Sequence, residues 1–290
     1  MPGEADSQRT KMHAAGFVRV NDCGRLHPAG RGEIVGKLAQ ILAISAMPMT
    51  SDQSFSGRRV VITGAGRGLG RALAIKIADH GAETALLGRD RAALQAVAET
   101  IRSRTGRDAL MAACDLTRPN SIADACRTVL AGDARVDILV NNAATWLTGA
   151  LADQPDAEIA AALAATVTGT ILVTKGLLPA LRSSPAADIV TVVSTAGWVR
   201  WDLGASAAFH AAKHGQSGFS DALRHELKGT GIRVTALYPP DFDDIDPLAP
   251  DWDNNERRKL SNREVVDTIL FAVTAPRACV YPVIMMDNLR

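Results

Sequence analysis

The chain has 290 residues, of which 47% are hydrophobic and 22% charged, and its formal net charge at pH 7 is +1. This composition allows a sizeable folded core and excludes a wholly disordered chain. The near-neutral balance offers no broad electrostatic surface to nucleic acid or to an anionic membrane, so we expect neither as a partner.

The first 55 residues differ from the rest of the chain. They are polar and irregular except at 34–47, where Ile34, Leu38 and Ile41 recur at roughly helical spacing. This stretch is far shorter than the about 20 apolar residues that span a membrane, and it lies too far along the chain for a signal peptide. Residues 1–55 are therefore a disordered extension with one short amphipathic helix, a peripheral targeting segment, or the product of an overlong start. We favour the first or the third.

Residues 56–290 form a single predicted domain, with no linker or internal repeat after residue 57. Short apolar runs predict buried strands, and apolar residues at mostly helical spacing predict helices. Their alternation predicts an α/β fold, a Rossmann-type doubly wound parallel sheet with helices on both faces in three layers. The predicted strands are 59–63, 83–87, 109–113, 136–140, 188–193, 232–237 and 280–285, and the predicted helices are 68–80, 91–104, 119–131, 157–182, 206–228 and 262–274.

A glycine-rich turn, Thr63-Gly64-Ala65-Gly66-Arg67-Gly68-Leu69-Gly70, follows the first predicted strand. Its glycines permit a tight turn and a close approach of backbone to ligand, and the helix that begins there offers free N–H groups to a pyrophosphate. A strand before the turn and a helix after it are the context that a dinucleotide site requires. We therefore predict that a dinucleotide binds at Gly64, Arg67, Gly68, Leu69 and Gly70.

Five motifs in the same order resemble the short-chain dehydrogenase/reductase family over about residues 57 to 285. Besides the Thr-Gly-x-x-x-Gly-x-Gly turn, they are Cys114-Asp115-Leu116, Leu139-Val140-Asn141-Asn142-Ala143-Ala144, Val193-Ser194-Thr195-Ala196-Gly197 and Ile232-Arg233-Val234-Thr235-Ala236-Leu237-Tyr238-Pro239. The resemblance implies the strand order 3-2-1-4-5-6-7. It places Asp115 and Leu116 beside the adenine and Asn142 along the cofactor. It also implies a homodimer or homotetramer built on the Ala- and Gly-rich helices at 157–182 and 206–228.

The end of the second predicted strand indicates which dinucleotide binds. Gly88 stands where NAD-selective relatives carry an acid that hydrogen-bonds the adenosine ribose, and Arg89 follows it. Arg67 in the glycine turn adds a second cation nearby, and arginine can grip a phosphate with two hydrogen bonds. We therefore predict NADP(H) rather than NAD(H). The alternative is that both arginines are solvated surface charges.

The family's reaction is hydride transfer between a nicotinamide and a carbonyl or alcohol, and it uses a Tyr, a Lys four residues later, a Ser and an Asn. Ser194 matches the family's serine and Lys213 its lysine, so we predict both as catalytic residues, with Lys213 also binding the cofactor. Phe209 stands at the tyrosine position and Thr166 at the asparagine position. Phenylalanine has no proton to give, so the usual acid is missing.

The loop after the sixth predicted strand also departs from the family. It reads Pro239-Pro240 where relatives read Pro-Gly, and an acidic run follows. Asp244 would weaken cofactor binding if it occupied the place of the family's threonine near the pyrophosphate. We expect the substrate loop at about 241–260. The acidic run meets a cationic substrate or is a solvated mobile loop; its residues are Asp241, Asp243, Asp244 and Asp246.

Several side chains are candidates to replace the tyrosine or to line the substrate pocket. His210 is the nearest titratable group, but it lies about 100° round the helix from Phe209. His210 and His214 have the i, i+4 spacing of metal ligands without a third ligand, so we expect surface or interface histidines and no metal. Tyr238 could approach the site. Two tryptophans either line a pocket or pack locally, and they are Trp198 and Trp201.

Together these features predict an NADP(H)-dependent oxidoreductase that acts on a small-molecule carbonyl or alcohol through an altered proton relay, in which water or the substrate supplies the proton. The alternative is a redox-inactive protein of the same fold, either a cyclase or isomerase or a cofactor-binding partner protein. The four cysteines form no CxxC pair, and such sparse cysteines favour a reducing, cytoplasmic setting. They are Cys23, Cys114, Cys126 and Cys279.

Overall fold

The computed structural model describes residues 54–132, 135–198, 204–254 and 259–288, which belong to one compact unit that begins at Ser51. The amphipathic helix predicted at 34–47 and Trp201 lie outside the described residues.

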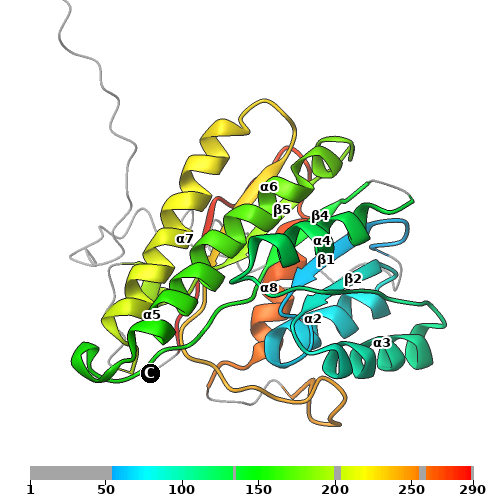
Figure 1. Cartoon of the computed structure of the whole chain (residues 1–290). Coiled ribbons are helices and arrows are strands. Elements are labelled where there is room, and N and C mark those ends of the chain that lie inside the picture. The colour runs from blue at the N-terminus through cyan, green and yellow to red at the C-terminus, as the bar shows by residue number, and fades with distance from the viewer. Residues whose placement is uncertain (1–53, 133–134, 199–203, 255–258, 289–290) are drawn as a thin grey trace, which may run out of the picture. The chain divides into compact units, whose positions relative to one another are not determined.

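A seven-stranded parallel sheet forms the middle layer (Figure 1). Its strand order is β3-β2-β1-β4-β5-β6-β7, so the predicted fold class and strand order are confirmed. The chain crosses from one half of the sheet to the other between β3 and β4, which makes the carboxyl ends of β1 and β4 a topological switch point. The strands are β1 (Arg59–Thr63), β2 (Glu83–Gly88), β3 (Leu110–Ala113), β4 (Ile138–Asn141), β5 (Asp188–Val192), β6 (Arg233–Tyr238) and β7 (Val283–Met285).

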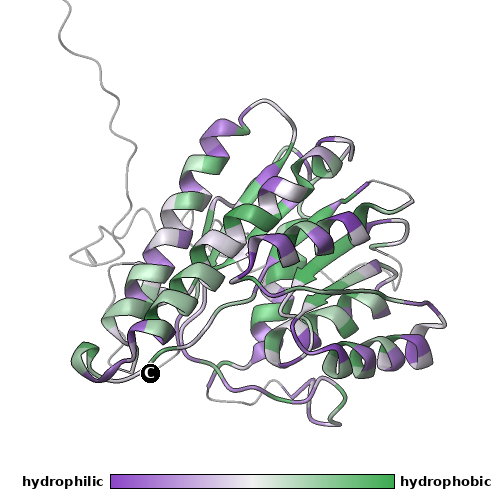
Figure 2. Cartoon of the chain, in the orientation of Figure 1, coloured by the Kyte–Doolittle hydropathy of each residue, from purple (hydrophilic) through white to green (hydrophobic). Residues whose placement is uncertain are grey.

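Helices cover both faces of the sheet. The helices α2 (Gly68–Asp79), α3 (Arg91–Thr105) and α8 (Asn262–Thr274) pack on one face. The other face carries α4 (Pro119–Leu130), α6 (Gly169–Arg182) and α7 (Ala207–Glu226). Alternate residues of each strand enter the two cores, as Val60 and Ile62 do on one face and Val61 on the other. The strands are accordingly apolar along their length, whereas α3 shows a polar outer surface (Figure 2).

Local signals explain where several helices begin and end. Asp90 caps α3 by accepting a hydrogen bond from Ala93 N, and Gly106 ends it in the left-handed conformation. Ser261 and Glu264 form a reciprocal capping box at the start of α8.

The helix predicted at 157–182 is continuous but contains a π-helical segment. It consists of α5 (Asp156–Leu163), a π-helical segment η3 (Ala164–Thr168) and α6, which follow one another without a break in helical winding. By length and composition alone this 27-residue stretch could cross a membrane, and it is the one such helix among the described residues. In this fold its α6 part packs on the sheet through Val173, Leu177 and Leu181, which are fully buried.

The last strand is shorter than predicted, because it begins at Val283 rather than at residue 280. The chain turns at Pro276–Cys279, where Cys279 N donates to Pro276 O. Pro282 already lies beside β6, since its carbonyl accepts from Ala236 N, but it has no N–H to extend the ladder.

A buried ionic cluster holds the amino-terminal edge of the sheet. Asp188, at the start of β5, is 3% exposed and accepts hydrogen bonds from three guanidinium groups. The nearest N···O distances are 3.0 Å from Arg58, 2.6 Å from Arg233 and 3.0 Å from Arg277. The arginines also donate to the carbonyl oxygens of Val273 and other residues. This single carboxylate therefore joins β5, β6, the residue before β1 and the chain after α8.

Candidate functional site

The glycine turn lies between β1 and α2, at the switch point of the sheet. Gly64 and Gly68 have φ values of +68° and +54°, which favour glycine. A Cβ on Gly70 would lie 2.1 Å from the carbonyl oxygen of Gly64, so no side chain fits there without movement of the backbone. The N-cap residue of α2, Arg67, makes no side-chain capping bond, which leaves the first N–H groups of the helix available to an anion.

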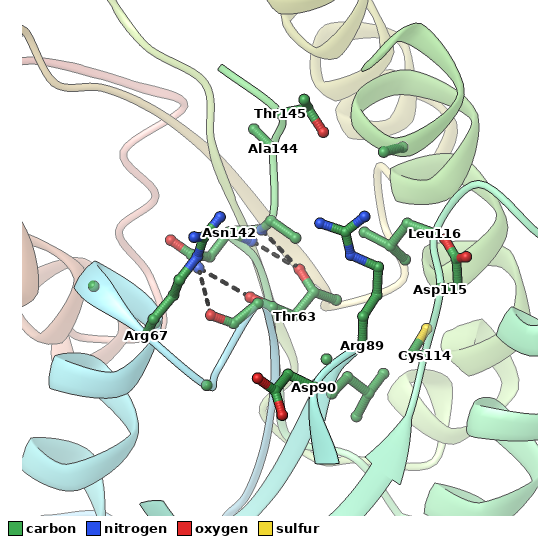
Figure 3. Close-up of a pocket in the computed structure, with 18 of the residues that line it drawn as sticks. Thr63, Arg67, Arg89, Asp90, Cys114, Asp115, Leu116, Asn142, Ala144 and Thr145 are labelled. Carbon is green, nitrogen blue, oxygen red and sulfur yellow. Dashed lines mark hydrogen bonds between the residues drawn. The ribbon is translucent and has the colours of Figure 1, made fainter. Parts of the chain in front are cut away.

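Asn142 fastens this turn to the end of β4. Its side-chain Nδ2 donates to Thr63 O at 2.9 Å, and its backbone N donates to Thr63 Oγ1 at 3.0 Å (Figure 3). Ala143 N donates to the same hydroxyl at 3.1 Å. Asn142 therefore fixes the glycine turn to β4, and its place along a cofactor stays a prediction.

A cavity of about 470 Å³ opens above the turn. The side chains of Arg67 and Arg89 lie on two sides of it (Figure 3). Both are exposed, and neither forms an ion pair with any other described residue. This region therefore offers two arginine side chains near a helix N-terminus, an arrangement that suits phosphate groups.

The predicted adenine-flanking residues lie at the far side of the same cavity. Asp115 Oδ1 accepts hydrogen bonds from Thr117 Oγ1 at 2.7 Å and Thr117 N at 3.0 Å. These bonds hold the pKa of the Asp115 carboxyl below its usual value. Leu116 is nearly buried and supplies an apolar wall. The predicted cofactor residues other than Lys213 all line this cavity; they are Gly64, Arg67, Gly68, Leu69, Gly70, Arg89, Asp115, Leu116 and Asn142.

A second cavity of about 250 Å³ adjoins the first and shares Leu69, Asn142 and Ala144 with it. Both predicted catalytic residues, Ser194 and Lys213, line this second cavity. Its remaining lining is largely apolar, and consists of Trp146, Val192, Val193, Phe209, Pro239, Pro240, Asp241 and Phe242.

Ser194 follows β5 in a strained backbone conformation. Its φ of +139° makes it the one non-glycine residue with positive φ among those described. Its Oγ accepts a hydrogen bond from Ala196 N at 3.1 Å, which holds the side chain at the cavity wall. Backbone strain of this kind persists where the surrounding structure enforces it and is common at functional sites.

Lys213 is buried in the middle of α7 with 4% of its surface exposed. Its Nζ donates to Val192 O at 3.0 Å and to Gln216 Oε1 at 2.9 Å. No described carboxylate lies within ion-pair distance of it. Burial lowers the pKa of Lys213 to about 7.

Phe209 lies one helical turn before Lys213 and faces the same cavity. Its ring packs edge-on against Trp146 with 4.5 Å between centroids, and Lys213 Nζ lies 5.7 Å from its centroid. Sequence analysis missed Trp146. Its place just after β4, at the carboxyl edge of the sheet where ligands bind in such folds, is the signal that could have found it.

Other candidates point elsewhere. Tyr238 is buried and shares a 2.7 Å hydrogen bond with Ser217 Oγ, so its hydroxyl is engaged with α7 outside the second cavity. His210 Nδ1 is bonded to Ala196 O at 2.9 Å. Trp198 packs on Tyr238 and is absent from the lining of either cavity. Within the described part of the chain, no cluster of three His, Cys, Asp or Glu residues could hold a metal ion.

Three of the four exposed aspartates in the acidic run after β6 pair with cations of the chain itself. Lys259 Nζ lies 3.3 Å from Asp241 and 2.7 Å from Asp243. Asp246 pairs with Arg71 at 2.9 Å. Residues 255–258 of the expected substrate loop lie outside the described residues.

Asp244 lies beside the glycine turn. Its Oδ1 accepts from Asn262 Nδ2 at 2.6 Å, and its Oδ2 lies 3.4 Å from the position that a Cβ on Gly68 would take. The carboxylate therefore stands next to the first residue of α2, where its charge opposes an anionic ligand.

Comparison with known proteins gives the family context. Residues 58–250 match a family model described as short chain dehydrogenase. An uncharacterized oxidoreductase of Staphylococcus epidermidis is 28% identical over 216 residues, which are 74% of this chain and 90% of the relative.

Solved structures are similar over most of the chain. A metagenomic short-chain oxidoreductase in complex with NADP has a TM-score of 0.69 and 28% identity, and the match covers 82% of this chain and 100% of that one. A short-chain dehydrogenase/reductase from Burkholderia xenovorans has a TM-score of 0.70 and 26% identity, with 81% and 96% covered.

Proposed function

The chain belongs to the short-chain dehydrogenase family, and from that premise we propose that it is an NADP(H)-dependent oxidoreductase of a small-molecule carbonyl or alcohol. The observation that carries the proposal is the pair of adjoining cavities, one beside the glycine turn and its two arginines, the other lined by Ser194 and Lys213. A related oxidoreductase of 28% identity was solved with NADP, which supports the choice of dinucleotide.

The residues of the first cavity fit such a cofactor. The backbone at Gly64 and Gly70 is packed too closely for side chains, and the start of α2 can receive a pyrophosphate. Arg67 and Arg89 would bind the 2′-phosphate. When bound, the dinucleotide would supply or accept a hydride at the second cavity.

The second cavity would bind and polarise the substrate. Ser194 lines this cavity and would hydrogen-bond a substrate oxygen, and the apolar lining would exclude water from the reacting atoms. Part of this proposal is that Phe209 takes the place of the family's acid/base tyrosine. The proton relay is then altered, because no hydroxyl projects from this position.

The direct test is to follow NADPH absorbance while the full chain is incubated with a panel of ketones and aldehydes. We expect slow NADPH-dependent reduction of at least one apolar ketone. Tight NADPH binding without turnover of any substrate would contradict the proposal. It would favour the redox-inactive alternative, for which the missing phenol at Phe209 is the specific observation.

The choice of NADPH over NADH depends on Arg89. Arg89→Ala should weaken NADPH binding about 10- to 100-fold, because a charge-assisted hydrogen bond is worth about 1.5–3 kcal/mol, and should leave NADH affinity nearly unchanged. Fluorescence titration with both cofactors measures the ratio. Arg91→Ala is the matched control, since Arg91 is exposed in the first turn of α3 and does not line the cavity. Equal losses for both cofactors would show that Arg89 does not read the 2′-phosphate.

We expect Asp244 to weaken NADPH binding, whereas we expect Arg89 to strengthen it. Asp244→Asn keeps an acceptor for Asn262 and removes the charge beside Gly68, so we expect NADPH to bind roughly 5-fold more tightly at low salt. Calorimetric titration at low and high ionic strength checks this, because the gain should shrink as salt screens the charge. Asp243→Asn, on the same loop, is the control. A weaker affinity in Asp244→Asn would mean that the carboxylate supports the turn rather than opposing the phosphates.

A further inference from the structure

Lys213 is held by a buried series of hydrogen bonds that the family resemblance did not suggest. Its partner Gln216 is 1% exposed. The amide Nε2 of Gln216 donates to Thr170 Oγ1 at 3.0 Å, and that hydroxyl donates to Thr166 O at 2.7 Å in the π-helical segment. Since the amide nitrogen is used on Thr170, the carbonyl oxygen of Gln216 must face Lys213.

These contacts leave part of the Lys213 ammonium group available. An ammonium has three N–H donors, and two are taken by Val192 O and Gln216 Oε1. No described residue accepts from the third. Lys213 lines the second cavity together with Ser194 and Phe209, so a substrate oxygen bound there by Ser194 would share this cavity with the Lys213 side chain.

We propose that Lys213, positioned by Gln216, supplies the proton to the substrate oxygen in place of the hydroxyl that Phe209 lacks. This inference rests on the proposed reductase function. As the carbonyl carbon is reduced, an N–H bond of the ammonium breaks and an O–H bond forms on the substrate. The electron pair stays on Nζ, which becomes a neutral amine and regains a proton from solvent. In the oxidative direction the neutral amine takes the proton.

Lys213 has a pKa suited to this role, because burial lowers it to about 7. The reduction needs the protonated form, whose fraction falls as pH rises through about 7. The rate of reduction should therefore fall above this pH, and the rate of oxidation should rise.

The charged and titratable groups of the neighbouring elements are engaged away from Nζ. His210 on α7 bonds Ala196 O, and Tyr238 on β6 bonds Ser217, with its pKa raised by burial. Asp241, on the loop after β6, pairs with Lys259. The acids in the first turn of α5, Asp156 and Glu158, are exposed.

The test compares the pH dependence of kcat/KM for ketone reduction in two Gln216 variants. Gln216→Glu replaces the side-chain amide with a carboxylate beside the ammonium group of Lys213. It should therefore raise the pKa of Lys213 by about one unit or more. The falling limb of kcat/KM for ketone reduction should move to higher pH by the same amount. Gln216→Met removes an acceptor of the ammonium and should move the limb to lower pH. Ser220→Ala, which removes another buried hydroxyl from α7, should leave the limb unchanged.

A second readout needs neither substrate nor turnover. In protein labelled with ¹³C and ¹⁵N at lysine, the Lys213 resonance is assigned by its absence in Lys213→Arg and titrated in wild type and both Gln216 variants. Agreement between the titration midpoint and the kinetic limb in all three proteins supports the proposal. A Lys213 midpoint near the ordinary lysine value, or a kinetic limb that stays fixed while the midpoint moves, would overturn this proposal alone. Absence of any NADPH-dependent reduction would overturn the proposed function, and this inference with it.

Discussion

Phe209→Tyr should raise kcat/KM for NADPH-dependent ketone reduction by about 10²-fold, the lower end of the range that a positioned general acid contributes, because Lys213 already supplies a proton. The ring of Phe209 already lies in the second cavity and is fixed edge-on against Trp146. A hydroxyl on this ring would enter the cavity near the Lys213 ammonium, whose charge would lower the phenol's pKa. Steady-state kinetics over a range of pH measures both the gain and the new pH dependence.

Phe209→Leu is the control, because it keeps an apolar side chain and adds no acid. Its rate should stay close to that of the unmodified protein, apart from some loss of packing against Trp146. If Phe209→Tyr binds NADPH normally and yet reduces no ketone faster, the ring does not face the reacting atoms. If only the tyrosine variant is active, the native chain has lost its redox function.

Asp188→Asn should lower the free energy of unfolding by about 3–5 kcal/mol, the usual cost of breaking a buried ion pair. Removal of this one carboxylate leaves the guanidinium groups of Arg58, Arg233 and Arg277 without their shared counter-ion. Urea denaturation gives the free energy directly. Because Asp188 begins β5 and the cavities lie beyond the other end of that strand, NADPH affinity should be unchanged where the variant is folded.

Asp221→Asn is the matched control, since Asp221 pairs with Arg224 on the exposed side of α7. Exposed pairs contribute at most about 1 kcal/mol. A loss at Asp188 no larger than the loss at Asp221 would show that the arginines find other acceptors, such as the carbonyl oxygens that they already contact.

Most of the fold could be predicted because its determinants are local. Apolar runs that end at glycines predict the strands, and the helix predicted at 262–274 matches α8, whose start is encoded by the Ser261 capping box. The π-helical segment in the helix predicted at 157–182 could not be predicted from sequence, because a π-helical turn leaves the apolar composition of the stretch unchanged. The last strand was predicted too long because residues 280–282 are largely apolar, whereas Pro282 has no N–H to donate to the ladder with β6.

The site residues likewise separate into those that a local sequence signal predicts and those that it does not. The glycine turn, Arg89 and Asn142 carry signals within a few residues of themselves, and the structure brings them to one cavity. Gln216 carries no such signal. It is a single amide in a helix, and its role depends on Thr170, which lies 46 positions away along the chain and beside it in space. The partners of the acidic run could not be predicted either, because Arg71, Lys259 and Asn262 are distributed over the chain.

The π-helical segment Ala164–Thr168 sets a limit on changes in chain length at this point. A π-helical turn holds one residue more than an α-helical turn, and each residue of an α-helix is rotated by about 100° from the one before. Deletion of one residue here would therefore turn the whole of α5 relative to α6. Thr166 O is the last acceptor in the series of hydrogen bonds that holds Gln216, and it would turn together with α5. This helix must therefore keep its length at the π-helical segment for Gln216 to keep its contact with Thr170.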